Sequence, residues 1–248
     1  MKWLAVISYV AMIIINVIAN TVGINGKTTG EISSQLEVLF TPAPYVFSIW
    51  VLIYFLLAIW LFKQLLLLTN DEQSKSRMDL FTSMSLYNIG WLLSWHYSYF
   101  LLSVVIMICL LISLIMLYVS YPAGDYRFSG RLPFSIYLGW ISVALMVNIS
   151  YVLKYYEWNG FGIAEQTWAQ ILLLLATLLA AYIRVQNRDI LFSLVVIWAF
   201  IGIAVQNGKD AGSLFYMPFV YSILLLLWIL VGLKWIIPAK KRPLKSSS

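Results

Sequence analysis

The chain has 248 residues, of which 62% are hydrophobic and 10% are charged, so it lacks the polar surface that a soluble domain of this length needs. Its net charge of +6 could suggest nucleic acid. The basic residues stand singly in short loops and in the C-terminal tail, however, so we expect no nucleic-acid partner. A single cysteine, Cys109, excludes an intrachain disulfide framework and a cysteine metal site. The composition therefore predicts an all-α integral membrane protein whose main partner is the lipid bilayer.

Eight apolar runs are long enough to form transmembrane helices, because about 20 apolar residues span a bilayer and lipid offers backbone groups no hydrogen-bond partner. The first run follows a single lysine, and we interpret it as a retained helix rather than a cleaved signal peptide. The predicted spans are Trp3–Val22, Tyr45–Leu68, Leu80–Trp95, Tyr97–Val119, Leu132–Leu153, Thr167–Ile183, Ile190–Gln206 and Leu214–Ile237.

The basic residues are distributed unevenly between the two sides of these spans, and cytoplasmic loops collect lysine and arginine. Of the 16 basic residues, only Lys27, Lys154 and Lys209 fall on one side. We therefore expect both termini on the cytoplasmic side, and we expect the membrane to be a bacterial plasma membrane. The basic residues of the other side are Lys2, Lys63, Lys75, Arg77, Arg127, Arg131, Arg184, Arg188, Lys234, Lys240, Lys241, Arg242 and Lys245.

Residues 23–44 form the longest connection on the side with few basic residues. Glycines at its beginning and two prolines at its end enclose an apolar stretch. We expect an external lid whose turn is capped by Ser33 or Ser34 and whose apolar side rests on the helices. A loop without regular structure is the alternative. The apolar side would comprise Leu36, Val38, Leu39 and Phe40.

Ionisable groups that could carry chemistry are scarce in the predicted spans. Asp79, Glu165 and Asp189 stand at helix starts, where a carboxylate favours the positive end of the helix dipole. Proton-coupled transport usually needs an ionisable group inside the membrane, and the motifs of hydrolases and kinases are missing from the sequence. The only histidine, His96, would either form hydrogen bonds at the membrane interface or ligate a haem iron, and the first role is the more common one.

Aromatic residues recur at helical spacing in the second, third and fifth spans, with asparagines beside them. Three such stripes favour a pocket for a flat, apolar ligand over a plain aromatic core. Interhelical hydrogen bonds are the alternative role for the asparagines, which include Asn16 and Asn20 of the first span. The candidate pocket residues are Phe47, Trp50, Tyr54, Asn88, Trp91, Trp95, Tyr137, Trp140 and Asn148.

Three motifs in these spans carry a family resemblance: PAPYVFSIWVLIY at residues 42–54, MSLYNIGW at 84–91 and IYLGWISVALMVN at 136–148. With them, residues 1–158 resemble the translocator protein family, also called tryptophan-rich sensory proteins. Tyr45, Met84 and Ile136 stand where the family pattern has Trp, Gln and Pro. The resemblance implies a five-helix core at residues 1–158. Residues 159–237 would then add three transmembrane helices, and residues 238–248 would be a basic cytoplasmic tail.

For function, the resemblance implies a non-enzymatic membrane sensor or binding protein for a small, flat hydrophobic ligand of the porphyrin or tetrapyrrole type, haem included. No cofactor is expected to be required, and a homodimer is one option for the oligomeric state. A permease for an apolar or amphipathic solute and a porphyrin-degrading enzyme are the alternatives. The family's sterol motif is met by Val147, Tyr151 and Lys154, a match of low specificity in a chain with 16 tyrosines.

Overall fold

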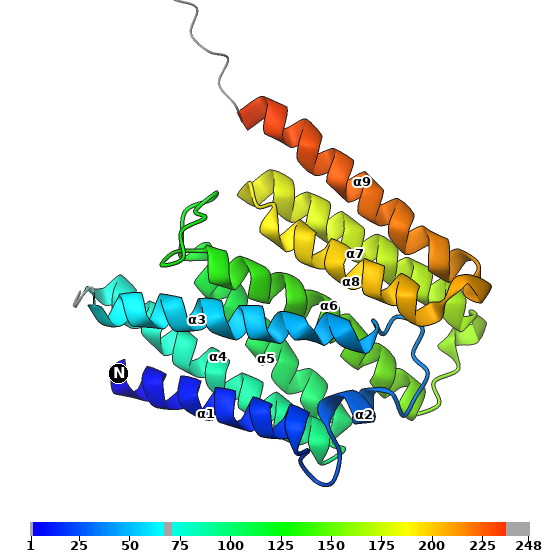
Figure 1. Cartoon of the computed structure of the whole chain (residues 1–248), viewed down its shortest axis with the longest axis horizontal. Coiled ribbons are helices and arrows are strands. Elements are labelled where there is room, and N and C mark those ends of the chain that lie inside the picture. The colour runs from blue at the N-terminus through cyan, green and yellow to red at the C-terminus, as the bar shows by residue number, and fades with distance from the viewer. Residues whose placement is uncertain (1, 67–70, 237–248) are drawn as a thin grey trace, which may run out of the picture.

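The computed structural model describes residues 2–66 and 71–236, with side chains up to residue 231, and the regular elements within these ranges are all helical. Eight long helices and the short α2 are joined by loops and three 3-10 turns (Figure 1). The helices are α1 Lys2–Thr21, α2 Thr29–Ser33, α3 Ile49–Leu66, α4 Glu72–His96, α5 Phe100–Val119, α6 Leu132–Tyr155, α7 Glu165–Asn187, α8 Leu191–Asn207 and α9 Ser213–Ile236; the turns are η1 Pro44–Ser48, η2 Gly160–Gly162 and η3 Lys209–Ala211.

Each predicted span corresponds to one long helix, and the all-α membrane fold is confirmed. The largest difference lies at α4, which begins at Glu72 rather than at the predicted Leu80. Asp71 caps this helix by accepting a 2.9 Å hydrogen bond from the backbone N–H of Ser74. A search for apolar runs misses such a polar first turn. The end of the predicted second span, residue 237 and the predicted tail at 238–248 lie outside the described residues.

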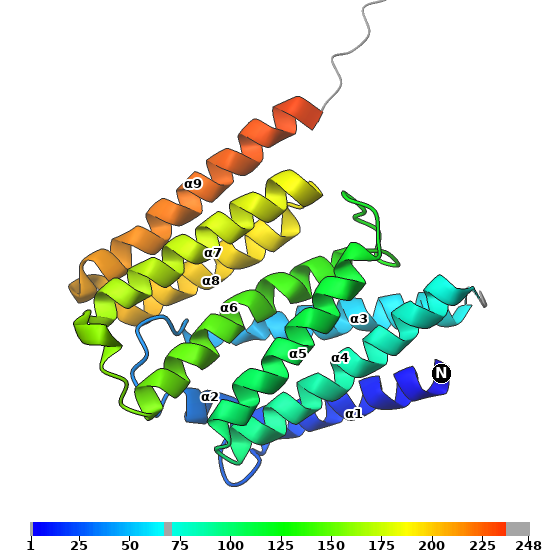
Figure 2. The ribbon, with the colours of Figure 1, turned by 180° about the vertical axis from the view of Figure 1, so that it is seen from behind.

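Consecutive long helices run in opposite directions and so define two ends of the bundle, as the two opposite views of Figures 1 and 2 show. We call the end that carries α2 the lid end, and the end where α1 begins and α9 stops the tail end. The start of α1 and the end of α9 therefore lie at the same end of the bundle. Lys27, Lys154 and Lys209 belong to the lid end, as the spacing of the spans predicts.

The most polar of the long helices, α4, packs between α1 and α5. Six other long helices are apolar and long enough to cross a membrane, and α8 is apolar but has 17 residues. Several polar side chains of α4 are buried and hydrogen-bonded, such as Ser85, whose hydroxyl donates to the backbone oxygen of Phe81 at 2.9 Å. Because neighbouring helices shield much of its surface from lipid, α4 needs less apolar character than the helices around it.

Helix α8 belongs to the same core as the first five long helices, and Phe200 on it is fully buried. A Cβ added at Gly202 would lie 2.1 Å from Cγ2 of Val46, so only glycine fits this approach. The oxygen of Gly202 accepts a 3.0 Å hydrogen bond from the N–H of Ala43, and Nε1 of Trp198 donates to the oxygen of Val46 at 3.1 Å. Helix α8 therefore fixes the turn that leads into α3. The domain boundary at residue 158 stays a prediction, and it would divide helices that share this core.

Helix α2 begins with a capping box. The backbone N–H of Glu31 donates to Oγ1 of Thr28 at 3.3 Å, and the N–H of Thr28 donates to Oε2 of Glu31 at 2.7 Å. The Thr28 hydroxyl also donates to Oε2 of Glu31 at 2.9 Å, and the two hydrogen bonds that this carboxylate accepts from Thr28 hold the pKa of the Glu31 carboxyl below its usual value. The predicted cap at Ser33 or Ser34 is wrong, because Ser33 is the last residue of the helix and Ser34 closes it.

The lid segment, residues 23–44, lies across the lid end with its apolar side inward, as expected. Ile32 and Val38 are buried and pack against Trp95 and Tyr151. Phe40 is buried in the main core. Burial of these side chains, rather than the five-residue helix itself, holds the segment in place.

A buried carboxylate joins α5, α6 and α8 at the tail end. Asp189 is 2% exposed, and its oxygens accept hydrogen bonds from the Tyr118 hydroxyl at 2.7 Å, the Ser135 hydroxyl at 2.6 Å and the backbone N–H of Leu191 at 2.9 Å. The guanidinium of Arg131 lies 3.5 Å from the centre of the Tyr118 ring. This tail-end cluster places Asp189 at the positive end of α8, the position that the sequence suggests for it.

Candidate ligand-binding site

The aromatic stripes of α3, α4 and α6 converge on the ring of Trp50. This ring stacks on Trp91 at a centroid distance of 6.2 Å and meets Trp140 edge-on at 6.1 Å. Tyr137 also meets it edge-on at 5.6 Å, and Tyr54 stacks on it at 5.4 Å. Aromatic pairs in these geometries contribute roughly 0.5–1.5 kcal/mol each beyond their buried area. The three helices are thus locked together around one ring.

A cavity of about 40 Å³ lies beside this ring, towards the lid end. Thr29, Ser33 and Pro42 of the lid segment line it from one side, and Val143, Ala144 and Val147 line it from α6. Six of the nine candidate pocket residues complete the lining, and we call these six residues the aromatic cage. They are Phe47, Trp50, Trp91, Trp95, Trp140 and Asn148.

The other three candidates, Tyr54, Asn88 and Tyr137, do not line the cavity. Asn88 links two neighbouring helices: Nδ2 of Asn16 donates to its Oδ1 at 2.8 Å, and its own Nδ2 donates to the Tyr137 hydroxyl oxygen at 2.8 Å. The hydroxyl of Tyr9 donates to the backbone oxygen of Tyr54 at 2.8 Å. Asn16 and Asn88 therefore form interhelical hydrogen bonds, and these connect α1, α4 and α6 next to the cage.

Four hydrogen-bond donors of the cage have no acceptor among the described residues. They are the indole Nε1 atoms of Trp91, Trp95 and Trp140 and the amide Nδ2 of Asn148. All four side chains are buried, and leaving such a donor unsatisfied costs roughly 1–3 kcal/mol. The Oδ1 of Asn148 does have a partner, the hydroxyl of Ser103 at 3.1 Å. The cage thus contains four buried donors for which the described residues provide no acceptor.

His96 connects the end of α4 to the lid segment. Its Nδ1 lies 3.1 Å from the backbone oxygen of Ile24, and its Nε2 lies 3.1 Å from Oγ1 of Thr29. A carbonyl oxygen only accepts, so Nδ1 carries the proton and Nε2 accepts from the Thr29 hydroxyl. Nδ2 of Asn25 also donates to the backbone oxygen of His96 at 3.2 Å. His96 therefore has the hydrogen-bonding role, and both of its ring nitrogens are occupied.

The residues of the sterol motif do not form one surface. Val147 lines the cage cavity, whereas Tyr151 is 2% exposed and packs against Trp95 and Phe100. Lys154 forms an ion pair with Glu165 at 2.9 Å. The sequence did not predict that Thr29 and Ser33 of the lid segment line the cavity. No periodic pattern shows which helix ends a loop will cover.

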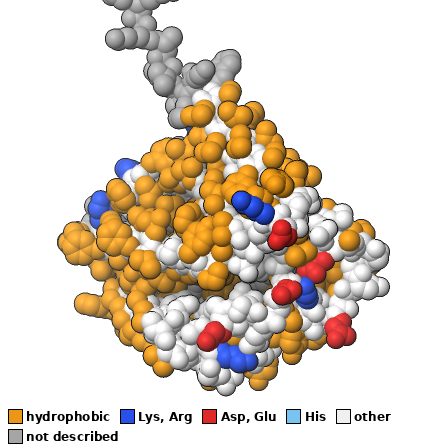
Figure 3. Space-filling model, turned by 45° about the vertical axis from the view of Figure 1, so that its right-hand side comes forward, with side chains coloured by type: hydrophobic (Ala, Val, Ile, Leu, Met, Phe, Trp, Pro, Cys, Tyr) orange, Lys and Arg blue, Asp and Glu red, His pale blue; other side chains and the backbone are white. Residues whose placement is uncertain are grey.

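The outer surface separates into two regions. Figure 3 turns the right-hand side of the Figure 1 view forward, and charged side chains gather on part of this face while hydrophobic side chains cover the area above them. Exposed apolar side chains also occur along the long helices, for example Leu4 on α1, Phe55 on α3 and Val231 on α9. Among residues 2–66 and 71–236, no group of three His, Cys, Asp or Glu side chains is arranged to hold a metal ion.

An all-α bundle with an apolar exterior and an aromatic cage beneath a lid defines a polytopic membrane protein with a candidate ligand site. A family model described as TSPO-like protein matches residues 2–231, and the chain belongs to this family. The match extends beyond residue 158, where the resemblance noted in the sequence ends, and includes α7, α8 and most of α9. No curated protein and no solved structure matches the chain.

Proposed function

We propose that this protein is a non-enzymatic membrane sensor or binding protein for a flat hydrophobic ligand with acceptor oxygens, such as a porphyrin that carries carboxylates. The observation that carries the proposal is the set of four unpartnered donors around one aromatic cavity. Aromatic rings favour the faces of a flat ligand, and the indole and amide N–H groups favour its oxygens.

Ligand entry requires the lid segment to move. The cavity of about 40 Å³ is far smaller than the roughly 300–1,000 Å³ of pockets for drug-sized ligands. The helices around the cage are held together by the aromatic rings that pack against Trp50 and by the hydrogen bonds of Asn88. The lid side, by contrast, depends on a short segment in which the His96 hydrogen bonds hold Ile24 and Thr29. The end of the lid segment is held by the burial of Phe40 and by the hydrogen bond from Ala43 to α8, so displacement of its first part, which carries Thr29 and Ser33, enlarges the site at the lowest cost.

We expect binding to depend on the cage tryptophans. Trp91→Leu and Trp140→Leu keep apolar character but remove a ring, and each should weaken porphyrin binding by roughly 1–3 kcal/mol, the usual loss for an aromatic stacking partner. Trp228→Leu on α9 is the matched control, because Trp228 is 47% exposed and lies outside the cage. Titration followed by tryptophan-fluorescence quenching measures all three. Equal losses at the three positions would indicate general destabilisation, and unchanged affinity in both cage variants would refute the site.

We also propose that the lid end faces away from the cytoplasm, because the lid end carries few basic residues. In a Cys109→Ser background, single cysteines at the exposed positions within residues 24–44 and 155–164 should react with an impermeant thiol reagent added to intact cells. Cysteines at residues 70–78 and 238–248 should be protected. Labelling of the 238–248 positions from outside would reverse the orientation.

A further inference from the structure

A second, larger cavity lies on the other side of the lid segment, between α6 and α7. Its volume is about 400 Å³, within the range of pockets that hold small molecules. Val38 to Phe40 of the lid segment, Ile149 and Leu153 of α6, and Leu172 of α7 contribute apolar walls. Leu153 and Ile163 at its edge are 36% and 43% exposed, so the cavity is accessible from outside the protein.

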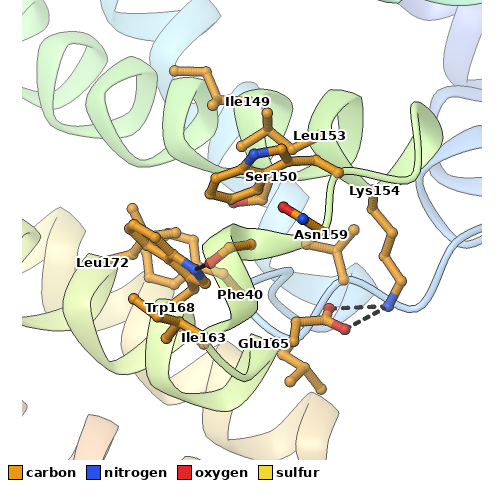
Figure 4. Close-up of a pocket in the computed structure, with 15 residues that line it drawn as sticks. Phe40, Ile149, Ser150, Leu153, Lys154, Asn159, Ile163, Glu165, Trp168 and Leu172 are labelled. Atoms are coloured by element: carbon orange, nitrogen blue, oxygen red, sulfur yellow. Dashed lines mark hydrogen bonds and ion pairs between the residues drawn. The ribbon is translucent and has the colours of Figure 1, made fainter.

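Its charged groups are confined to one side. Figure 4 shows Lys154 and Glu165 together, with Ile149 and Leu172 away from them. The Nζ of Lys154 lies 2.9 Å and 3.0 Å from the two carboxylate oxygens of Glu165 and also donates to the backbone oxygen of Glu37. The cavity thus has an apolar interior and one balanced pair of opposite charges at its polar side.

The aromatic residues of this cavity differ from those of the cage. Trp158 and Trp168 pack against each other at 5.3 Å, and Nε1 of Trp168 already donates to the backbone oxygen of Gly160 at 3.0 Å. Their rings therefore do not offer a free slot for a flat aromatic ligand. Because α6 ends at Tyr155 and α7 begins at Glu165, the ion pair lies at the ends of two membrane-spanning helices, where lipid headgroups meet their chains.

We propose that this cavity binds a zwitterionic phospholipid, with one acyl chain inside it and the headgroup at the Lys154–Glu165 pair. The phosphate would face Lys154 and the ammonium would face Glu165, so each protein charge keeps an opposite partner. A lipid with a single negative charge would leave Glu165 without a partner when it engages Lys154. The proposal is independent of the aromatic cage, since the two cavities share none of their lining residues.

Photocrosslinking in nanodiscs tests the cavity. The probe is a phosphatidylcholine with a diazirine in one acyl chain, and mass spectrometry counts its adducts on residues 149–172. Ala169→Leu and Leu172→Trp fill the cavity from two positions, and each should lower these adducts about tenfold, because the chain loses its enclosed position. Leu174→Phe is the control, since Leu174 is 44% exposed on the same helix and lies outside the lining. Unchanged adducts in both filled variants, with the control also unchanged, overturn the proposal.

The headgroup is tested in the same discs with a phosphatidylglycerol probe that has the same chain. Glu165→Gln leaves Lys154 without its carboxylate partner and should raise the ratio of phosphatidylglycerol to phosphatidylcholine adducts roughly fivefold, as expected for one partly exposed ion pair. Glu157→Gln, an equal charge change at an exposed residue outside the lining, should leave the ratio unchanged. An unchanged ratio in Glu165→Gln, or an equal rise in both variants, overturns the proposal.

Discussion

The Asp189 carboxylate of the tail-end cluster and the donors of the aromatic cage are both buried polar groups, but only the carboxylate finds its hydrogen-bond partners within the protein. Asp189 accepts hydrogen bonds from two hydroxyls and from backbone N–H groups, so it joins helices. In the cage, the donors of Trp91, Trp95, Trp140 and Asn148 have no acceptor among the described residues. A satisfied buried group stabilises the fold, whereas a set of unsatisfied donors around one cavity reduces stability and favours a ligand that provides acceptors. Changes at the two regions should therefore affect different properties.

The largest effect on stability is expected at the tail end. Asp189→Asn keeps the size of the side chain but leaves one oxygen where two accept hydrogen bonds, so buried donors lose their partner. We expect a loss of about 3–5 kcal/mol in the free energy of unfolding, the range for breaking a buried charged interaction. Denaturant titration in detergent measures it, and Asp210→Asn at an exposed residue is the control. Porphyrin affinity of the folded fraction should stay unchanged. A loss of affinity without a loss of stability would reverse the contrast between the two regions.

A smaller effect, on lid movement, is expected at His96. His96→Phe keeps a ring but removes both nitrogens that hold the lid segment, so residue 33 should become accessible more often. Losing two hydrogen bonds of roughly 0.5–1.5 kcal/mol each predicts about a tenfold faster thiol labelling of Ser33→Cys, in the Cys109→Ser background. Tyr97→Phe, at a neighbouring exposed residue, should not change the rate. Equal labelling with and without the His96 nitrogens would mean that the lid is held by packing alone.

The smallest effect is expected at the capping box of α2. Because the pKa of Glu31 is lowered in the folded lid, its contribution is present above the pKa that Glu31 has in the unfolded chain. That contribution is lost as pH falls through the lowered pKa. Amide-exchange protection of residues 28–31, corrected for the intrinsic pH dependence of exchange, should therefore decrease at acidic pH. Glu31→Ala should make protection lower and independent of this transition, and a full transition in Glu31→Ala would assign it to another group.

Much of the fold follows from the sequence, because lipid imposes a simple rule on it. Each apolar run must close its own hydrogen bonds, so eight runs predict eight long helices, and the structure has them. This rule did not predict the polar start of α4, because that start depends on the cap at Asp71 rather than on the length of an apolar run. The rule also did not predict the role of α8 in the core, because the fit of Gly202 against Val46 depends on two segments far apart in sequence.

Part of the candidate site also follows from the sequence, because helical periodicity shows which side chains face the interior of the bundle. Helical periodicity places Trp50, Trp91 and Trp140 on inward faces, and the three rings do meet. Periodicity does not distinguish a residue that lines a cavity from one on the same helix face that only contacts neighbouring helices. Tyr137, one turn before Trp140 on α6, is of the second kind, since it accepts a hydrogen bond from Asn88 and does not line the cavity. Periodicity also says nothing of which indole N–H groups find acceptors. Those differences depend on how the helices are placed relative to each other and on the path of the lid segment.

The most direct test compares two porphyrins with the same ring, one carrying two carboxylates and one with alkyl groups in their place. Both should stack on the cage, but only the first offers acceptors to the four donors. We predict that the dicarboxylate binds at least about tenfold more tightly, since one hydrogen bond to a charged group contributes roughly 1.5–3 kcal/mol. We also predict that Asn148→Leu reduces this preference. Equal affinity for the two porphyrins would contradict the assignment of the cage as a donor site for a ligand with acceptor oxygens.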